Sequence, residues 1–296
     1  EMMSLLVESI KSIEDFFDTN RPDVVVGFTI ATFGEYLISL VAKERGVKFI
    51  QLRHTKIKNY YTFSSDLHEG FESIRKEYEK GTHDKDNNNF IDNYIDEATN
   101  KGMTYEGTVG YKDSVKTIFM EYPKQFLISI INDFKYLKVK KDGHYKVAFI
   151  KIFFYDKLYR FFKKKYQDRV LSKTYIDKSE LNKKSYAFYP LHAEPEIAIS
   201  IFSIFYQNQI EVIRNISMSL PAGYKLLVKE HPRNIGRRST SYYNKISQIP
   251  NVELVDAYCN TSYIISNSRI VVVLQGFLGF EALMHDIPVI SLGSAM

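Results

Sequence analysis

The sequence predicts an α/β protein in which two Rossmann-like domains flank a helical insertion. Three observations predict this class. Apolar runs of strand length alternate with stretches of helical periodicity at both ends of the chain, the runs are continuously apolar, and the stretch between them is helical, basic and aromatic. Continuous apolar runs are typical of parallel strands that helices cover on both faces. We place the three parts at residues 1–65, 66–184 and 185–296.

The N-terminal part alternates in the order helix, strand, helix, strand. We expect helices at residues 4–20 and 34–47, and strands at residues 22–28 and 48–52. No G-x-G-x-x-G fingerprint is present, and Gly27 alone is weak evidence for a nucleotide. The alternation itself indicates a doubly wound sheet.

The middle part carries most of the positive charge. Residues 135–184 contain sixteen Lys or Arg against five Asp or Glu, so the rest of this chain of net charge +5 is acidic. A helical stretch at residues 145–171 interleaves these cations with Phe and Tyr. Such a helix can lie on an anionic membrane surface, hold an acidic glycan or lipid-linked acceptor, or bind nucleic acid. We expect the aromatic side chains to pack in a core of the insertion and the lysines to contact membrane or glycan. No nucleic-acid module accompanies them.

The C-terminal part is the most regular. Strands are expected at residues 185–190, 224–230, 252–256, 270–274 and 287–293, with helices between them at residues 196–220, 241–249, 261–268 and 279–286. Five strands with four intervening helices make a complete Rossmann-like domain, in which right-handed crossovers keep the strands parallel.

Ligands of such sheets bind at the carboxyl ends of the strands, where the connecting loops converge. Three loops of the C-terminal part carry polar residues or glycine at these ends: His192, Glu194, Glu196, Glu230, His231, Arg233, Gln275, Gly276, Gly279 and Glu281.

The glycine loop predicts a phosphate site. We expect Gly276 and Gly279 to lie between a buried strand and a helix that begins near Phe280, so that backbone amides and the helix N-terminus face the ligand. Glu281, in the first helical turn, would then accept hydrogen bonds from ribose hydroxyls. The alternative is a tight turn whose glutamate only complements the helix dipole.

His231 is followed by Pro232 at the end of an apolar strand. Proline fixes its own φ and favours an extended conformation in the residue before it, so we expect the imidazole to be held in one orientation. An oriented histidine beside a phosphate donates a hydrogen bond to it and, when protonated, offsets its charge. The alternative is an ordinary polar strand end.

Three motifs together resemble a known family. The runs "YPLHAEPE", "LPAGYKLLVKEHP" and "LQGFLGFEALMHDIPVISLG" are similar to those of the capsular polysaccharide biosynthesis family, which includes the bacterial Kdo transferases of capsule assembly. The resemblance covers residues 185–296 well and the N-terminal part more loosely. It implies a GT-B glycosyltransferase architecture, with two Rossmann-like domains that face each other across a cleft and a nucleotide sugar held by the C-terminal one.

The resemblance also implies roles for single residues. His231 and Pro232 match the motif that contacts the donor phosphate in related enzymes that use CMP-linked sugars, and Glu281 matches the residue that holds the ribose. Glu194 stands where the common form of the motif has glutamine. Gln275 and Phe277 stand where it often has Thr and Ser, so hydroxyl donors are lost and the identity of the donor stays open.

A general base is expected from the N-terminal part, across the cleft. Glu35 and His54 follow its two strands and are our candidates, although Glu35 at the start of a helix is also suited to capping it. No D-x-D pair stands at a strand end to bind a metal, so we expect no metal and no cofactor.

The composition bounds the remaining alternatives. The chain has 296 residues, of which 45% are hydrophobic and 25% charged, and no apolar run approaches the roughly 18 residues of a membrane span. The single cysteine, Cys259, excludes an internal disulfide and indicates a passive thiol. We expect a cytoplasmic protein, with a possible association at the inner face of the membrane. Because the sequence begins inside a predicted helix, we also expect it to be part of a longer protein.

Together these observations predict a glycosyltransferase of bacterial capsule or surface polysaccharide biosynthesis. It would transfer a sugar from a nucleotide-sugar donor to a glycan or lipid-linked acceptor. Of the possible donors, we expect a CMP-linked sugar. Three alternatives stay open: a non-hydrolysing UDP-sugar epimerase, a non-catalytic module of the assembly complex that binds glycan or membrane, and a nucleic-acid-binding protein whose binding would fall steeply with salt.

Overall fold

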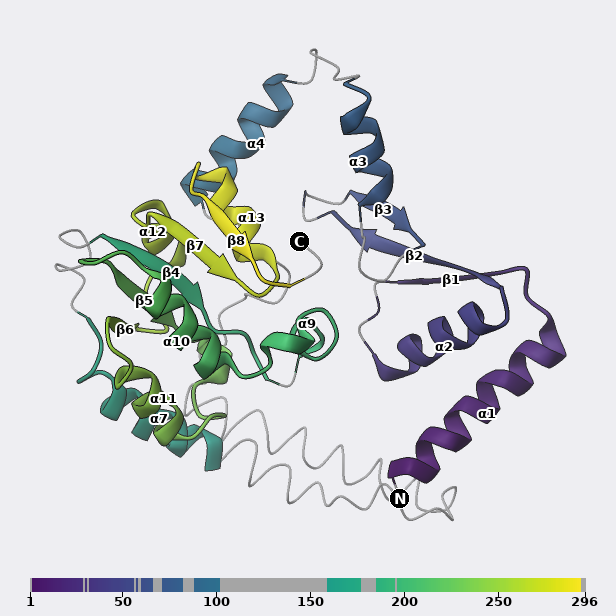
Figure 1. The fold of residues 1–296 in the computed structure, drawn as a ribbon, viewed down its shortest axis with the longest axis horizontal. Coiled ribbons are helices and arrows are strands. Elements are labelled where there is room, and N and C mark those ends of the chain that lie inside the picture. The colour runs from purple at the N-terminus through teal and green to yellow at the C-terminus, as the bar shows by residue number, and fades with distance from the viewer. Residues whose placement is uncertain are drawn as a thin grey trace, which may run out of the picture. The chain divides into compact units, whose positions relative to one another are not determined.

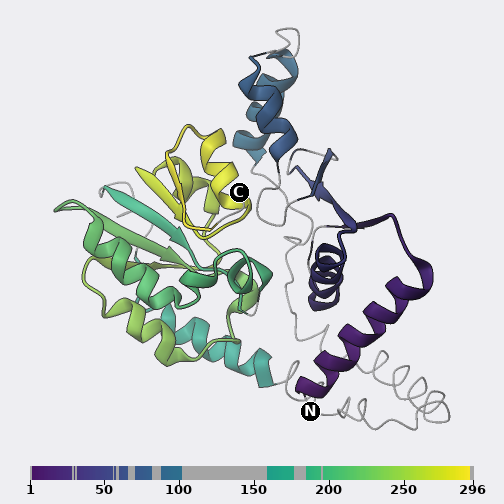
Figure 2. The same ribbon diagram turned by 45° about the vertical axis from the view of Figure 1, so that its right-hand side comes forward.

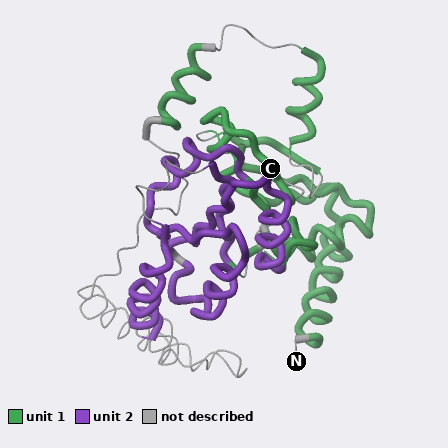
Figure 3. Tube along the Cα trace, turned by 60° about the vertical axis from the view of Figure 1, so that its left-hand side comes forward, with its two compact units in different colours: residues 1–102, 194–207, 272–296 green, residues 103–193, 208–271 purple. Residues whose placement is uncertain are grey.

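Two compact units make up the chain. The computed structural model describes residues 2–28, 30, 32–55, 57, 60–65, 71–81, 88–101, 159–176, 185–194 and 196–293 (Figure 1). Unit 1 comprises residues 1–102, 194–207 and 272–296, and unit 2 comprises residues 103–193 and 208–271 (Figure 3).

The beginning of unit 1 confirms the predicted alternation. Its elements are α1 (Met2–Asn20), β1 (Val24–Phe28), α2 (Phe33–Glu44), β2 (Lys48–His54) and β3 (Tyr61–Ser64). Strands β1 and β2 pair in parallel, with Val24 opposite Lys48 and Phe28 opposite Leu52. β3, which the sequence did not predict, pairs antiparallel with β2. Phe17 of α1 packs with Val41 and Ala42 of α2 to form the local core.

The other elements of unit 1 come from distant parts of the sequence. They are α3 (Glu72–Glu79), α4 (Asn88–Lys101), α9 (Ile197–Ser200), the 3-10 helix η5 (Ile204–Tyr206), α13 (Phe277–Met284) and β8 (Val289–Ser291). α13 contacts α4 and β8.

Unit 2 contains most of the C-terminal elements. They are α7 (Arg160–Leu171), β4 (Tyr186–Pro190), α10 (Gln209–Ser219), β5 (Lys225–Lys229), the 3-10 helix η6 (Pro232–Asn234), α11 (Thr240–Ser247), β6 (Val252–Val255) and α12 (Thr261–Ser266). β7 (Ile270–Val273) begins in unit 2 and ends in unit 1.

The larger sheet confirms the α/β class. Its strand order is β6-β5-β4-β7-β8, and β4 pairs in parallel with both β5 and β7. All five predicted strands are present. Every residue of β4 is buried, and the hydroxyl of Tyr186 donates a hydrogen bond to the Ile264 carbonyl at 2.9 Å. The apolar run of β4 therefore comes from a strand covered on both faces, as the pattern indicated. The same expectation is wrong for β1, in which Val24, Val26 and Phe28 are exposed.

The single helix predicted at residues 196–220 is wrong. The segment forms α9, η5 and α10 instead. Asn208 is the N-cap of α10, and its side chain accepts a hydrogen bond from the Glu211 amide at 3.5 Å. Asn at such a position favours a new helix start over continuation of the preceding one. Phe205 of η5, in the middle of the predicted helix, is 93% exposed.

α7 belongs to unit 2, and the residues that follow it lie beside β6. After α7 the chain runs beside that strand: Tyr175 forms a parallel bridge with Leu254, and the Ile176 amide donates to the Leu254 carbonyl at 3.0 Å. α7 and α11 lie side by side (Figures 1 and 2). The predicted helix at residues 145–171 is confirmed for residues 160–171. Residues 102–158 and 177–184, which include most of the basic stretch, lie outside the described residues.

Two further sequence predictions can be compared with the fold. Among the described helices, none combines the length and the hydropathy that spanning a lipid bilayer requires. Cys259 is a free, buried thiol, in keeping with a passive role.

Candidate functional site

Glu230 is the centre of a buried hydrogen-bond network at the carboxyl end of β5. Its side chain is only 4% exposed. Oε1 accepts hydrogen bonds from the His231 amide at 2.7 Å and from Asn234 Nδ2 at 3.2 Å. Because both donors belong to the loop that follows β5, the carboxylate fixes the backbone of that loop on either side of Pro232.

The second oxygen of Glu230 ties this loop to α11. Oε2 accepts a hydrogen bond from the Tyr243 hydroxyl at 3.0 Å and lies 2.8 Å from Nε of Arg238. Burial raises the pKa of the Glu230 carboxyl, and attraction to Arg238 together with the three hydrogen bonds opposes that rise. A carboxylate without these partners would be costly at this depth.

Arg238 joins the loop after β5 to the loop after β4. Its guanidinium pairs with Glu230 through Nε and donates from Nη2 to the backbone carbonyl of His192. The guanidinium carbon also lies 4.6 Å from the centre of the Tyr242 ring. Sequence reasoning singled out Arg233 in this loop and missed Arg238. The Arg-Arg pair of "GRRS", immediately before a helix, is the signal that could have found it.

The backbone of His192, a predicted donor-binding residue, is held by the side chain of Gln209. Gln209 accepts a hydrogen bond from the His192 amide at 2.9 Å and donates one to the His192 carbonyl at 3.1 Å. Burial, with the charges of Arg238 and His231, lowers the pKa of the His192 imidazole to about 4. The ring is therefore neutral near pH 7, and its buried Nε2 has no hydrogen-bond partner within the described parts of the chain.

Gln167 of α7 holds the loop that carries Arg238. The Gln167 side chain is fully buried, accepts a hydrogen bond from the Gly236 amide at 2.8 Å and donates one to the Arg238 carbonyl at 2.8 Å. Gly236 has φ +90, and a Cβ there would lie 3.1 Å from the Arg160 carbonyl oxygen. Only glycine fits this approach, so a helix of the predicted insertion helps to build the candidate site.

His231 has a fixed backbone and an exposed side chain. Its amide donates to Glu230, and its carbonyl accepts a hydrogen bond from the Asn234 amide at 2.8 Å, which closes η6. Pro232 is the first residue of η6, where its missing N–H costs nothing, and Arg233 is the second. A hydrogen-bonded turn therefore carries the imidazole, while the single orientation expected from the His-Pro pair stays a prediction.

The predicted glycine loop lies in unit 1, and its helix begins one turn earlier than expected. α13 starts at Phe277, with Gly276 as its N-cap at φ 113. Gly279 is therefore a buried helical residue, and Glu281 is buried beyond the first turn. The predicted start near Phe280 is wrong because a positive φ at Gly276 already turns the chain from β7 into the helix. Gln275 precedes this cap, and Glu194 is an exposed residue of the loop after β4.

The two candidate bases have structural contacts in unit 1. Glu35 forms a capping box with Thr32: its Oε2 accepts from the Thr32 amide at 2.9 Å, and the Glu35 amide donates to Thr32 Oγ1 at 3.3 Å. His54, the last residue of β2, packs edge-on against Tyr61 at 5.2 Å between ring centres. The capping role considered for Glu35 is confirmed, and a catalytic role for either residue stays a prediction.

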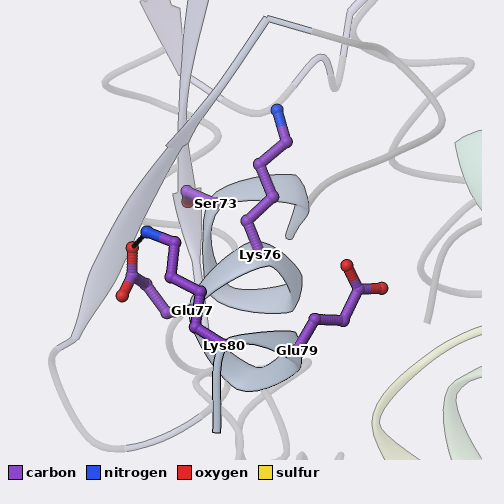
Figure 4. A pocket seen from close by; sticks show the side chains of 5 residues that line it. All are labelled: Ser73, Lys76, Glu77, Glu79 and Lys80. Carbon is purple, nitrogen blue, oxygen red and sulfur yellow. Dashed lines mark hydrogen bonds and ion pairs between the residues drawn. The ribbon is translucent and has the colours of Figure 1, made fainter. Parts of the chain in front are cut away.

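No cluster of three His, Cys, Asp or Glu side chains that could hold a metal ion occurs in the described residues. A shallow depression on α3 is formed by Ser73, Lys76, Glu77, Glu79 and Lys80 (Figure 4). Lys80 pairs with Glu77 at 2.5 Å, and Lys76 pairs with Glu72 at 2.6 Å. A single helix forms this depression with charges that neutralise one another, so we do not regard it as a ligand site.

Comparison with known families decides the assignment. The family model of capsule polysaccharide biosynthesis proteins matches residues 91–296, which include β4 to β8 and the Glu230 network. The chain belongs to this family. The part of this capsule polysaccharide biosynthesis protein that matches the family model includes the α/β region with the candidate donor residues.

Three solved structures illustrate what this capsule polysaccharide biosynthesis protein is similar to. KpsC of Thermosulfurimonas dismutans, a beta Kdo 2,7 transferase, is 19% identical, with 45% of this chain and 48% of that chain covered and a TM-score of 0.30. UDP-GlcNAc 2-epimerase of Methanocaldococcus jannaschii is 13% identical over 96% of this chain and 65% of its own, with a TM-score of 0.33. The enzyme of Neisseria meningitidis bound to UDP-GlcNAc is 15% identical over 99% and 65%, with a TM-score of 0.30.

The chain thus spans about half to two thirds of the length of these proteins, between 48% and 65%. A search of curated proteins found no match.

Proposed function

We propose that this protein is a glycosyltransferase of bacterial capsule or surface polysaccharide assembly, acting on a nucleotide-sugar donor with a glycan or lipid-linked acceptor. Membership of the capsule polysaccharide biosynthesis family and a parallel α/β sheet support the proposal. We propose that it acts in the cytoplasm, within a GT-B arrangement of two Rossmann-like domains.

The Glu230 network is the observation that carries the proposal. A buried acid, Arg238 and Tyr243 together fix two loops that follow neighbouring parallel strands, which is where ligands of such sheets bind. The fixed loops carry two histidines with different properties: His231, which is exposed on the turn after β5, and His192, which is neutral and whose buried Nε2 has no hydrogen-bond partner among the described residues. Rigid placement of hydrogen-bonding groups is what stabilisation of a departing phosphate requires.

Four of the predicted donor residues have a direct role in this proposal. His231 donates a hydrogen bond to the donor phosphate as the bond between phosphate oxygen and anomeric carbon breaks. His192 offers a second hydrogen bond. The N-terminus of α13, opened by Gly276, adds backbone amides for the same phosphate, and Glu281 binds the ribose.

The acceptor hydroxyl attacks the anomeric carbon and passes its proton to a base, for which Glu35 and His54 are the candidates. We propose that the reaction needs no metal, because the imidazole and the helix N-terminus take over the stabilisation of the leaving phosphate.

Calorimetric titration with CMP, UDP and GDP tests the donor site. We expect one of the three to bind the wild type, CMP before the others, and binding to weaken by at least tenfold in His231→Ala. His285→Ala, at the C-cap of α13, is the matched control. If none of the three nucleotides binds, the proposal is wrong.

Two outcomes would favour the alternatives. Conversion of a UDP-sugar in the absence of any acceptor would identify an epimerase. Binding of nucleotide or glycan without turnover, over a panel of CMP- and UDP-sugars with an oligosaccharide acceptor, would identify a non-catalytic module.

A further inference from the structure

α7 has an inner face that packs on unit 2 and an outer face that does not. The inner face buries Phe161, Gln167 and Leu171, and Gln167 holds the Arg238 loop. Because these residues anchor the helix to the rest of the unit, the orientation of its outer face is fixed.

The outer face exposes three aromatic side chains in a row. Tyr159 is 51% exposed, Phe162 60% and Tyr166 62%. Their spacing of three and four residues places them on one side of the helix. The prediction that the aromatic residues of the insertion pack in a core is therefore wrong for these three. Three neighbouring aromatic residues exposed to water indicate a contact surface rather than scattered surface residues.

Positive charges surround this aromatic row. Five of the twelve residues of α7 are Lys or Arg, and Asp168 is its single acidic residue. Lys165 and Arg169 are exposed and each follows an aromatic residue, Phe162 or Tyr166, at a spacing of three, so they share the aromatic side of the helix. Lys173, also exposed, lies in the turn directly after the helix. Asp168, six residues after Phe162, lies on another side. Within the described residues, neither Arg169 nor Lys173 pairs with a carboxylate.

We propose that this outer face of α7 and the turn after it, formed by Tyr159, Phe162, Lys165, Tyr166, Arg169 and Lys173, dock on an anionic lipid surface. Aromatic rings are stable at the boundary between headgroups and acyl chains, and Lys or Arg beside them attract lipid phosphates. The charge also disfavours a second copy of this chain, since a two-fold contact through this face would bring equivalent cations together.

Docking through this face would also act on the candidate site. The same helix carries Gln167, which holds Gly236 and the Arg238 carbonyl on its other side. A membrane-bound α7 would therefore hold the Arg238 loop on the side of the helix that faces away from the lipid, close to a lipid-linked acceptor. The docking itself does not depend on the proposed function.

Vesicle co-sedimentation of the full chain tests the proposal. Vesicles of phosphatidylcholine alone are compared with vesicles of equal parts phosphatidylcholine and phosphatidylglycerol, at low salt and at about 1 M salt, where charges are screened beyond about 3 Å. We expect binding to the anionic vesicles at low salt and its loss at high salt. The pair Arg169→Glu and Lys173→Glu should weaken binding by about tenfold or more, and the pair Phe162→Ser and Tyr166→Ser should weaken it on anionic vesicles to a similar extent.

Matched controls remove the same residue types from other exposed positions. Phe205→Ser takes away a ring that is 93% exposed, and Lys245→Glu reverses an exposed charge on α11. Both should bind vesicles as the wild type does. Equal loss in the controls, equal binding to neutral vesicles, or no binding to either kind would overturn the proposal.

Two other occupants would give distinct results. If sedimentation velocity shows a dimer that the α7 variants dissociate, while vesicles do not bind, the face is an interface between copies. Retention on a soluble acidic polysaccharide without vesicle binding would identify a glycan surface. In either case the lipid proposal is wrong, whereas the nucleotide titrations report separately on the donor site.

Discussion

Arg238 and Glu230 form a buried ion pair, with 2.8 Å between Nε and Oε2 and side-chain exposures of 7% and 4%. The pair lies where the loops after β4 and β5 meet, because Arg238 also donates to the carbonyl of His192. One guanidinium thereby holds two loops together, through residues that are 46 positions apart in the sequence.

Removal of the cation should destabilise the protein strongly. Arg238→Met keeps much of the side-chain volume but leaves a buried carboxylate without its partner, which costs about 3 kcal/mol or more in the free energy of unfolding. Urea denaturation at pH 7 measures this loss. Arg269→Ala, at an exposed position, should change stability by less than about 0.5 kcal/mol.

A double variant separates the charge from the packing. If the cost comes from the unpaired carboxylate, Glu230→Gln in the Arg238→Met background should recover part of the lost stability, because a neutral amide is cheaper to bury. A double variant less stable than Arg238→Met would contradict this account.

The sequence predicted the fold better than the site. The strands β4 to β7 could be found because most of their residues are buried, which leaves nearly continuous apolar runs. The break between α9 and α10 could not, because it depends on one capping side chain, Asn208, inside an apolar helical pattern. β3 lacks such a run, since its burial alternates.

The site residues that could be predicted are likewise those that local sequence features mark. His231 and Pro232 could be singled out because strand end and proline are local features. Arg238 and Gln167 could not, since their roles depend on tertiary contacts between segments about 70 residues apart. The start of α13 was misplaced because a positive φ at Gly276 cannot be distinguished in sequence from the freedom of any other glycine.

His192 should make stability depend on pH. Its pKa is lowered to about 4 in the folded protein from an ordinary value of 6.5. Between these values the unfolded chain binds the proton and the folded protein does not, so stability is complete above pH 6.5 and falls as the pH drops toward 4, by about 3 kcal/mol in total.

Urea denaturation at pH 7 and pH 5 checks this expectation. His192→Gln should lose less stability than the wild type over that interval. Glu230, whose raised pKa acts in the opposite direction, is present in both proteins, so the difference between them isolates His192. An equal loss in both would mean that the imidazole is not held in its neutral form.

Gly276 should tolerate no side chain. Its φ of 113 is strained for any residue with a Cβ, so Gly276→Ala should lower the free energy of unfolding by about 1 kcal/mol or more. Gly34 is the matched control: it lies in the first turn of α2, its φ is not in the positive range, and a Cβ there would meet only Thr32 Oγ1 at 3.9 Å. Gly34→Ala should be neutral or slightly stabilising. Thermal unfolding of the two variants compares them, and equal effects would place the cause outside the backbone conformation.

Glu35 offers a way to separate capping from catalysis, because the two roles need different chemistry from the same carboxylate. The capping box with Thr32 needs only an acceptor oxygen, which glutamine also provides, whereas a general base needs a group that takes up a proton. Glu35→Gln should therefore change stability by less than about 0.5 kcal/mol and reduce the rate of sugar transfer by at least 100-fold, on the order expected for a lost base.

Thr32→Ala should give the opposite pattern, since it removes the N-cap hydroxyl and keeps the carboxylate. We expect a loss of about 1 kcal/mol in the free energy of unfolding, with most of the transfer rate retained. Unfolding curves and initial rates of both variants complete the comparison. Full activity in Glu35→Gln would restrict Glu35 to the capping of α2 and leave His54 as the candidate base.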